Sequence, residues 1–131
     1  MFKDNSSVRT LILSGNHMTD SDITTIAPAL RLNSTIVSLD LSYNSIGDFG
    51  AIAIGQGVAQ NDTLKELNLA WNMIRSRGAL GMFNSLRDNS ILSSLNMESN
   101  SLADSVAPVV GQYIGKNSAL TSVNFKCVFS P

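Results

Sequence analysis

The sequence contains few of the residues that enzymes and metalloproteins use for chemistry. Among its 131 residues there is one histidine, His17, and one cysteine, Cys127. A zinc site of ordinary size takes three or four histidine, cysteine or carboxylate ligands, so this chain cannot supply a histidine or histidine–cysteine set. A single cysteine also excludes an internal disulfide and favours a reducing compartment. We therefore expect a non-enzymatic, cytoplasmic protein that holds no metal or other cofactor.

Charge and long apolar runs are scarce as well. Charged residues make up 15% of the chain and the net charge is −1. This balance argues against the basic surface with which proteins hold nucleic acid. No apolar run approaches the roughly 18 residues that a membrane-spanning helix requires. The sequence therefore predicts neither nucleic acid nor a membrane as a partner.

The most prominent feature of the sequence is an internal repeat. A nine-residue phrase returns every 28 residues, as VRTLILSGN at 8–16, IVSLDLSYN at 36–44, LKELNLAWN at 64–72 and LSSLNMESN at 92–100. A fifth copy, LTSVNFKCV, begins at Leu120 and has Val128 in place of the final asparagine. A fixed period is the signature of a solenoid, whose units bury their apolar faces only by stacking. We expect one domain over residues 1–131, with the end of a truncated repeat at 1–7, full repeats at 8–35, 36–63, 64–91 and 92–119, and a terminal half repeat at 120–131.

The hydrophobic periodicity changes within each repeat. Leu39 and Leu41 alternate with polar residues, which predicts a strand with one face buried, whereas Ala51, Ile54 and Val58 have helical spacing. Each repeat is therefore predicted to be a strand, a turn and a helix. An asparagine recurs where each helix should end, and we expect it to adopt the left-handed conformation that often closes a helix. These residues are Asn33, Asn61, Asn89 and Asn117.

The pattern L-x-x-L-x-L-x-x-N, followed by I-G-D-x-G-A in the second repeat, resembles the leucine-rich repeats of the ribonuclease-inhibitor-like subfamily. Repeats of this length also occur in NOD-like receptors and in the Ran GTPase-activating protein. The resemblance implies an α/β fold: a right-handed solenoid in a horseshoe arc of about four and a half repeats, with a parallel sheet on the concave face and helices on the convex face. It also implies that one asparagine per repeat bonds to turn backbone inside the stack. This structural ladder consists of Asn16, Asn44, Asn72 and Asn100.

Strand side chains that lie between the leucines must point away from the core, onto the concave face. Tyr43 and Trp71 hold the eighth position of neighbouring phrases, so they are predicted to stand side by side at the strand ends. Tryptophan, tyrosine and arginine are enriched at binding hot spots. We therefore predict a partner-binding surface made of Asp40, Tyr43, Glu66, Asn68, Trp71, Met73, Arg75, Arg77, Asn96 and Glu98.

The C-terminal repeat predicts a second surface. Its strand around Val123 and Phe125 would leave an unpaired edge, and no helix follows to bury Val128 and Phe129. A second copy of the chain could cover this end about a two-fold axis. We therefore predict a homodimer through an interface of Tyr113, Val123, Phe125, Cys127, Val128 and Phe129.

The resemblance implies a protein–protein interaction module that regulates or recognises other proteins in innate immunity or intracellular signalling. Two alternatives stay open. One is a regulator of an enzyme, of the nuclease-inhibitor or GTPase-activator type. The other is a scaffold fragment of a larger repeat-containing receptor. The sequence does not identify the partner.

Overall fold

The computed structural model describes residues 7–126 and, as a short strand, residues 129–130. The main strands are β1 (Thr10–Ile12), β2 (Ser38–Asp40), β3 (Glu66–Asn68), β4 (Ser94–Asn96) and β6 (Ser122–Asn124). The helices are α1 (Asp20–Leu32), α2 (Asp48–Ala59), α3 (Ser76–Leu86) and α4 (Ala107–Lys116), the last preceded by the short 3-10 helix η2 (Asp104–Val106).

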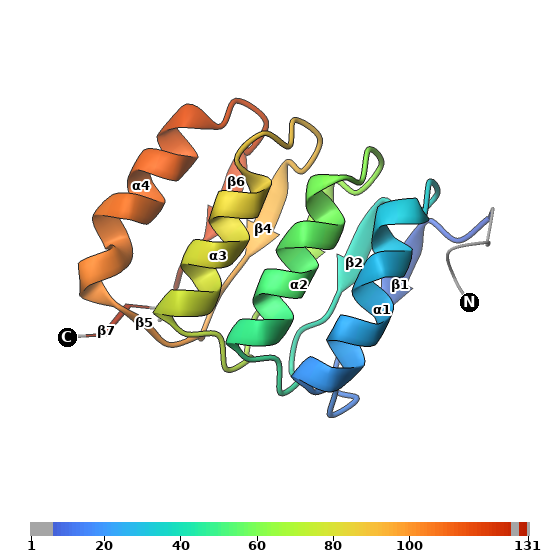
Figure 1. Ribbon diagram of the computed structural model, residues 1–131, viewed down its shortest axis with the longest axis horizontal. Coiled ribbons are helices and arrows are strands. Elements are labelled where there is room, and N and C mark those ends of the chain that lie inside the picture. The colour runs from blue at the N-terminus through green and yellow to red at the C-terminus, as the bar shows by residue number, and fades with distance from the viewer. Residues whose placement is uncertain (1–6, 127–128, 131) are drawn as a thin grey trace.

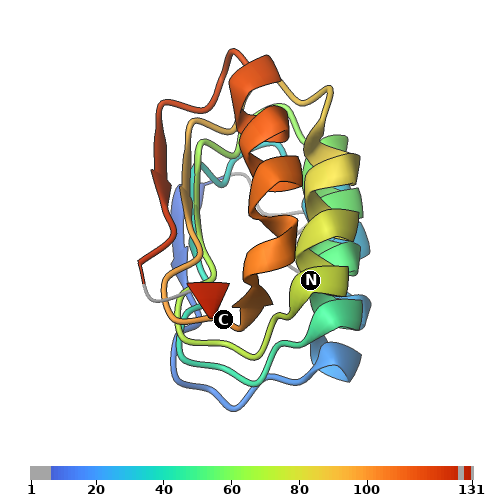
Figure 2. The same ribbon diagram turned by 90° about the vertical axis from the view of Figure 1, so that its left-hand side faces the viewer.

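The five main strands form one parallel sheet in the order β1-β2-β3-β4-β6. Each residue pairs with the residue one repeat later, so that Leu11, Leu39 and Leu67 lie in one row across the sheet. The helices lie side by side and cover one face of this sheet (Figure 1), and the end-on view shows the two separate layers (Figure 2). The predicted α/β solenoid of strand, turn and helix is therefore confirmed.

The core fills the space between the two layers. Leu39, Leu67 and Leu95 point inward from the strands and are buried, and Ile54 and Met82 meet them from the helices. Because the strand pattern has period two and the helix pattern has a period near 3.6, each unit presents one apolar face. Stacking then joins these faces into one continuous cluster.

A ladder of asparagines closes the turns after β1, β2, β3 and β4. The Asn44 side-chain oxygen accepts bonds from the N–H groups of Asn16 and Met18, and its amide donates to the Leu13 carbonyl 3.1 Å away. Asn72 and Asn100 repeat the pattern one and two repeats later. Asn16 stands at the start of the stack and is exposed, and its side-chain amide donates to carbonyls of its own turn, those of Leu13 and Ser14.

A second ladder lies at the opposite ends of the strands, where the helices finish. Asn61 donates to the carbonyls of Leu30 and Asn33 in the preceding repeat, and its oxygen accepts from the N–H groups of Thr63 and Leu64. Asn89 makes the equivalent bonds, and Asn117 makes most of them.

The expectation of a left-handed conformation at these helix ends is wrong. Asn33 has φ −73° and Asn117 has φ −89°, both of which are ordinary extended backbone. These asparagines are required for their side-chain amide, which bonds forward and backward along the stack. A left-handed backbone occurs instead in the turns after β1, β2, β3 and β4.

The helices do not all pack equally closely. A Cβ added to Gly57 of α2 would lie 2.6 Å from the Ala27 carbonyl oxygen, and one added to Gly55 would lie 2.9 Å from the Met82 Cα. These glycines therefore let α2 approach both of its neighbours. By contrast, nothing lies within 4 Å of a Cβ placed on Gly111 or Gly115 of α4. The last helix is consequently less tightly packed than the others.

The chain end contributes a separate small sheet. Strand β5 (Leu102–Ala103) precedes η2 and pairs in parallel with β7 (Phe129–Ser130). Strand β7 therefore lies beside the segment that leads into η2 and α4 (Figure 1).

Candidate functional site

The turns that follow the first four main strands, β1 to β4, each contain a residue in the left-handed region at the same position of the phrase. Its φ is 69° at Gly15, 55° at Tyr43 and 56° at both Trp71 and Ser99. Glycine adopts this conformation freely, whereas other residues pay about 1–2 kcal/mol. Two bulky aromatic residues are therefore held in an unfavourable backbone conformation. Gly15, at the same position of the phrase, is the one sequence signal for this conformation, which was not predicted for Tyr43 or Trp71.

Tyr43 and Trp71 stack on each other across neighbouring repeats. Their ring centroids are 5.6 Å apart and their planes differ by 8°. Tyr43 is 60% exposed and Trp71 is 49% exposed. The spacing follows from the sheet, because adjacent strands lie about 4.8 Å apart and equivalent side chains leave the turns in parallel. The predicted side-by-side placement therefore corresponds to a stacked pair of rings that is open to solvent.

The backbone N–H group of each aromatic residue is hydrogen-bonded to the turn of the next repeat. The Tyr43 N–H donates to the Ala70 carbonyl at 3.0 Å, and the Trp71 N–H donates to the Glu98 carbonyl at 2.8 Å. The rings thus project from a rigid turn. Met73, 58% exposed, follows two residues after Trp71 and extends the apolar surface.

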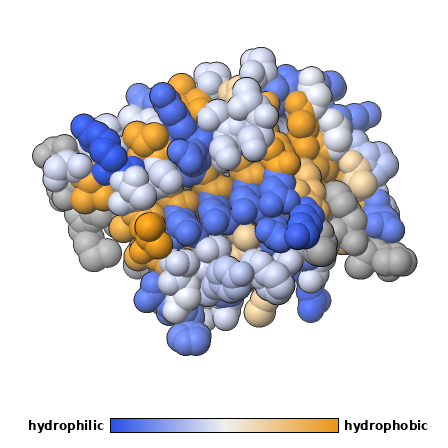
Figure 3. Space-filling view, turned by 180° about the vertical axis from the view of Figure 1, so that it is seen from behind, coloured by the Kyte–Doolittle hydropathy of each residue, from blue (hydrophilic) through white to orange (hydrophobic). Residues whose placement is uncertain are grey.

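A row of polar side chains crosses the concave face beside this pair. This polar row consists of Asp40, Asn68, Asn96 and Asn124, which occupy equivalent positions on neighbouring strands. The equivalent residue of β1 is the apolar Ile12. Figure 3 shows a hydrophilic band running across this face. The row borders a hollow of about 240 Å³ that is also lined by Ser38, Glu66 and Ser94.

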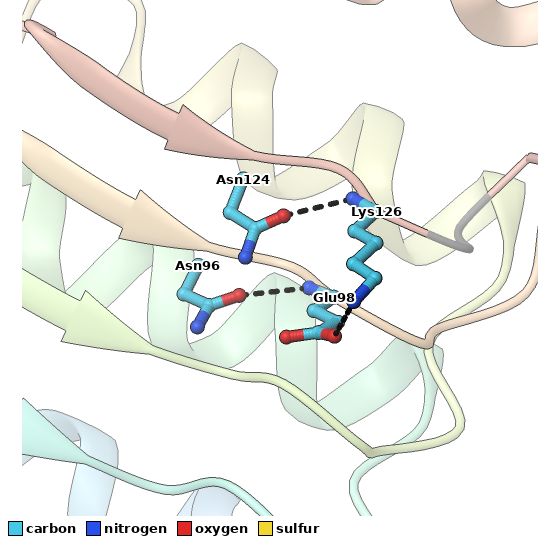
Figure 4. Close-up of polar contacts among 4 residues, drawn as sticks. All are labelled: Asn96, Glu98, Asn124 and Lys126. Carbon is cyan, nitrogen blue, oxygen red and sulfur yellow. Dashed lines mark hydrogen bonds and ion pairs between the residues drawn. The ribbon is translucent and has the colours of Figure 1, made fainter.

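Each member of the polar row also caps the turn that follows it. The side-chain oxygen accepts a bond from the N–H two residues later, at 2.9 Å for Asp40, 3.0 Å for Asn68 and 2.9 Å for Asn96. Figure 4 shows this bond in Asn96 and in Asn124, together with the ion pair of 3.9 Å between Lys126 and Glu98. These bonds leave the carboxamide N–H groups of the asparagines without a partner among the described residues. They therefore face the concave side as fixed hydrogen-bond donors.

The structure does not bring the predicted arginines to the aromatic pair. Arg75 directly precedes α3 and Arg77 lies in its first turn. The Arg75 backbone N–H donates to Asp48 at 2.8 Å, and both side chains are exposed. No contact joins either guanidinium to Trp71 within the described part of the chain. The arginines therefore border the start of the helix layer, while the aromatic pair borders the concave face.

The C-terminal surface is only partly described. Val123 and Phe125 are partly buried, and Phe125 and Tyr113 both pack against Phe83, with centroids 6.0 and 5.2 Å from it. Strand β6 is the last strand of the main sheet. Cys127 and Val128 lie outside the described residues, and Phe129 is described only as part of β7.

The described residues contain no evident metal site. Nowhere in residues 7–126 and 129–130 do three or more His, Cys, Asp or Glu side chains come together where they could hold a metal ion. None of the helices in this part of the chain is both long enough and apolar enough to cross a bilayer.

Comparison with known proteins identifies the repeat. The family described as Leucine Rich repeat matches residues 4–27, 32–55 and 60–83, which together make up more than half of the chain. The chain belongs to the leucine-rich repeat family. No protein of curated function matches this leucine-rich repeat sequence at a significant level.

Several solved structures share the fold. One of them is the actin-binding site 2 of leiomodin-1, with a TM-score of 0.83 and 21% sequence identity. The similarity covers 94% of this chain and 71% of that chain. At this identity the likeness establishes the shared leucine-rich repeat fold. The leucine-rich repeat family match favours a protein-binding module.

Proposed function

We propose that this leucine-rich repeat protein is a non-enzymatic interaction module, and that it binds its partner through Tyr43, Trp71, Met73 and the adjoining polar row. The observation that carries the proposal is the stacked Tyr43–Trp71 pair, which is exposed although each ring offers a large apolar area. Burying such rings against a partner contributes strongly to binding.

The rigidity of the pair supports this role. Residues in left-handed turns fixed by hydrogen bonds to both neighbouring turns lose little further freedom on binding. Preorganisation of this kind lowers the entropic cost of association. The polar row beside the pair, together with Glu66 and Glu98, would provide the hydrogen bonds that orient the partner. Arg75 and Arg77 would contact the partner only if it reached around to the start of α3.

The biological setting is inferred from resemblance. The ribonuclease-inhibitor-like repeat pattern favours regulation or recognition in innate immunity or intracellular signalling, and the single cysteine favours the cytoplasm. Regulation of an enzyme, as by a nuclease inhibitor or a GTPase activator, is the alternative within the same pattern. A repeat segment of a larger receptor would use the same surface.

Actin is a second candidate partner. The observation that favours it is the likeness to the leiomodin-1 actin-binding site 2 across nearly the whole chain. Sedimentation with filamentous actin and gel filtration with monomeric actin test this candidate directly. Co-migration that Trp71→Ala abolishes would support it, and no co-migration at tens of micromolar protein would exclude it.

We also propose self-association through the C-terminal repeat. Its basis is the position of β6 at the end of the sheet, with Val123 and Phe125 only partly buried there. A strand edge of this kind can pair with another chain. Light scattering on reduced protein should give a dimer mass that Val123→Asp converts to a monomer mass in a variant with an unchanged circular dichroism spectrum. A wild-type monomer at tens of micromolar would exclude the interface.

Affinity capture tests the main proposal. Wild-type and Trp71→Ala proteins, immobilised at equal density, are incubated with an extract of the native source. A protein retained by the wild type and lost with Trp71→Ala identifies the partner. Equal retention of every captured protein by the two would move the binding site elsewhere.

A further inference from the structure

The hollow on the concave face is negatively charged. Among the described residues that line it, the charged ones are Asp40 of β2 and Glu66 of β3, and the others are serines, leucines and asparagines. No ion pair joins either carboxylate to a lysine or arginine in the part of the chain that the structure describes. Glu98, by contrast, is paired with Lys126 at 3.9 Å. The unneutralised charge of this face therefore lies on β2 and β3.

The two carboxylates lie close together on one face of the sheet. Glu66 pairs with Ser38, and Asn68 pairs with Asp40, so Asp40 and Glu66 are on adjacent strands and two positions apart along them. Adjacent strands lie about 4.8 Å apart, and residues two positions apart on a strand are separated by about 7 Å. One extended segment of a partner can therefore contact both carboxylates. Two negative charges at this spacing repel each other, and a cation between them would remove the repulsion.

The Asp40 carboxylate is held in place by the turn that it caps. One of its oxygens accepts bonds from the Ser42 N–H at 2.9 Å and from the Ser42 hydroxyl at 2.6 Å. Its second oxygen makes no hydrogen bond within the described residues. A fixed carboxylate with one free oxygen is a preorganised acceptor for a cationic donor.

The aromatic pair offers a surface for a flat cation at the end of the same strand. Trp71 covers one face of the Tyr43 ring. On the other side, the equivalent residue of the preceding repeat is Gly15, which has no side chain, and a Cβ placed on it would have nothing within 4 Å. The second face of the Tyr43 ring is therefore open. The planar guanidinium of arginine stacks on such a face, whereas the compact ammonium of lysine cannot.

The asparagines of the polar row add hydrogen-bond donors beside these groups. The side-chain oxygens of Asn68 and Asn96 are used by the turns that they cap, and their N–H groups face the concave side. The carbonyl oxygens of a peptide backbone are acceptors for such donors. The face thus presents acceptors for cationic side chains and donors for main-chain carbonyls.

We propose that the concave face binds an extended, arginine-containing segment of a protein partner. Guanidinium groups of the segment pair with Asp40 and Glu66 and stack on the open face of Tyr43, and its main-chain carbonyls accept bonds from the asparagine amides. This inference rests on the proposed function, because it assigns the chemistry of the partner that the aromatic pair and the polar row bind.

The probe is acetyl-Gly-Arg-Gly-Arg-Gly-amide (the arginine peptide), titrated at low ionic strength into the uniformly ¹⁵N-labelled protein and followed by amide chemical shifts. Saturable shifts should concentrate in β2, β3 and the turns that follow them. The same peptide with citrulline, which keeps the shape of arginine and lacks its charge, should bind at least about fivefold more weakly, and the lysine peptide about twofold more weakly. Equal affinity of the arginine peptide and either analogue would overturn the proposal.

The repeat itself supplies matched substitutions. Asparagine holds the Asp40 position in the next strands and caps the same turn, so Asp40→Asn removes the charge and should keep the fold. Asp40→Asn with Glu66→Gln should weaken the arginine peptide about tenfold, and Asn68→Asp, which adds a carboxylate to the hollow, should tighten it about threefold. The control is Asp104→Asn, which removes an exposed carboxylate at the start of η2 and should leave the affinity unchanged.

Three results with these variants would overturn the proposal. They are no saturable shift at millimolar arginine peptide, an unchanged affinity in the double variant of Asp40 and Glu66, and an equal loss in the Asp104 control. Tighter binding of acetyl-Gly-Glu-Gly-Glu-Gly-amide would also overturn it, because the amide donors would then select the partner.

The captured partner separates this inference from the proposed function. The arginine assignment predicts that the partner is lost both with Trp71→Ala and with the double variant of Asp40 and Glu66. Loss with Trp71→Ala alone would overturn the arginine assignment and leave the proposed function standing. Retention by both variants would overturn the proposed function and the arginine assignment together.

Discussion

The side-chain amide of Asn72 donates to the carbonyl oxygen of Leu41, which lies 3.0 Å away and 31 residues earlier in the chain. In return, the Asn72 oxygen accepts from the backbone N–H of Ile46 at 3.0 Å. The amide also donates to the Leu69 carbonyl of its own repeat at 3.1 Å. One side chain thus satisfies buried backbone groups of two repeats. The stack is held together by such contacts as well as by its apolar core, because unpaired backbone groups would otherwise be buried between the units.

Replacement of Asn72 by alanine is therefore expected to be costly. Asn16 occupies the same position in the first repeat, but it is exposed and its side-chain amide donates to carbonyls of its own turn. We expect Asn72→Ala to lower the free energy of unfolding by at least about 2 kcal/mol and Asn16→Ala to lower it by less than about 1 kcal/mol. Urea unfolding followed by circular dichroism measures both. Equal losses would mean that burial within the ladder has no energetic effect.

The helix glycines are expected to respond in opposite directions to the same substitution. Gly57→Ala places a methyl group 2.6 Å from the Ala27 carbonyl oxygen, whereas Gly115→Ala meets nothing within 4 Å. We expect Gly57→Ala to destabilise the protein by about 1–3 kcal/mol and Gly115→Ala to stabilise it by up to about 1 kcal/mol. Thermal unfolding of the two variants provides the comparison. Stabilisation by Gly57→Ala would show that α1 and α2 do not approach this closely.

The Tyr113 hydroxyl predicts a loss of stability in alkali. Burial raises its pKa from 10.0 to about 12 in the folded protein, so the folded state holds this proton more tightly than the unfolded state does. This contribution is complete below pH 10 and is lost as the pH rises through 12. Tyr113→Phe should flatten the decline in that window, and at pH 7 it should leave the stability unchanged or slightly raised. The midpoint of urea unfolding between pH 7 and 12 tests this, with Tyr43→Phe as the exposed control.

The fold could be read from the sequence because its determinants are local and periodic. Leu39 and Leu67 mark the strands, Ile54 and Met82 mark the helices, and a constant spacing of 28 residues fixes the register. In a solenoid, neighbouring repeats in the sequence are neighbours in space. The order of the strands in the sheet therefore follows their order in the sequence.

The roles of the other asparagines were harder to predict. Asn61 was expected to end a helix in a left-handed conformation, but it joins neighbouring repeats through its amide. Asn96 was assigned to a binding surface, but its oxygen also caps the turn that follows it. The sequence shows that these residues recur. It does not show which backbone groups lie within reach of their side chains.

The aromatic residues also differ in how far their surroundings could be predicted from the sequence. Tyr43 and Trp71 could be placed side by side because they hold one position of the repeat. The contact between Phe83 of α3 and Tyr113 of α4 depends on how far the two helices stand apart, and no periodic pattern encodes that distance. Tyr113 was therefore assigned from the sequence only to the predicted homodimer interface, and its packing against Phe83 was not foreseen.

The most direct test of the account is the affinity of the captured partner for Trp71→Ala, measured by isothermal titration beside the wild type and Leu32→Ala. Leu32 is a similarly exposed apolar residue at the end of α1, so it controls for the loss of apolar surface in general. We expect Trp71→Ala to weaken binding by about 2 kcal/mol, close to thirtyfold, and Leu32→Ala to change it less than about twofold. Equal affinities of the wild type and Trp71→Ala, with both correctly folded, would contradict the assignment of the binding surface.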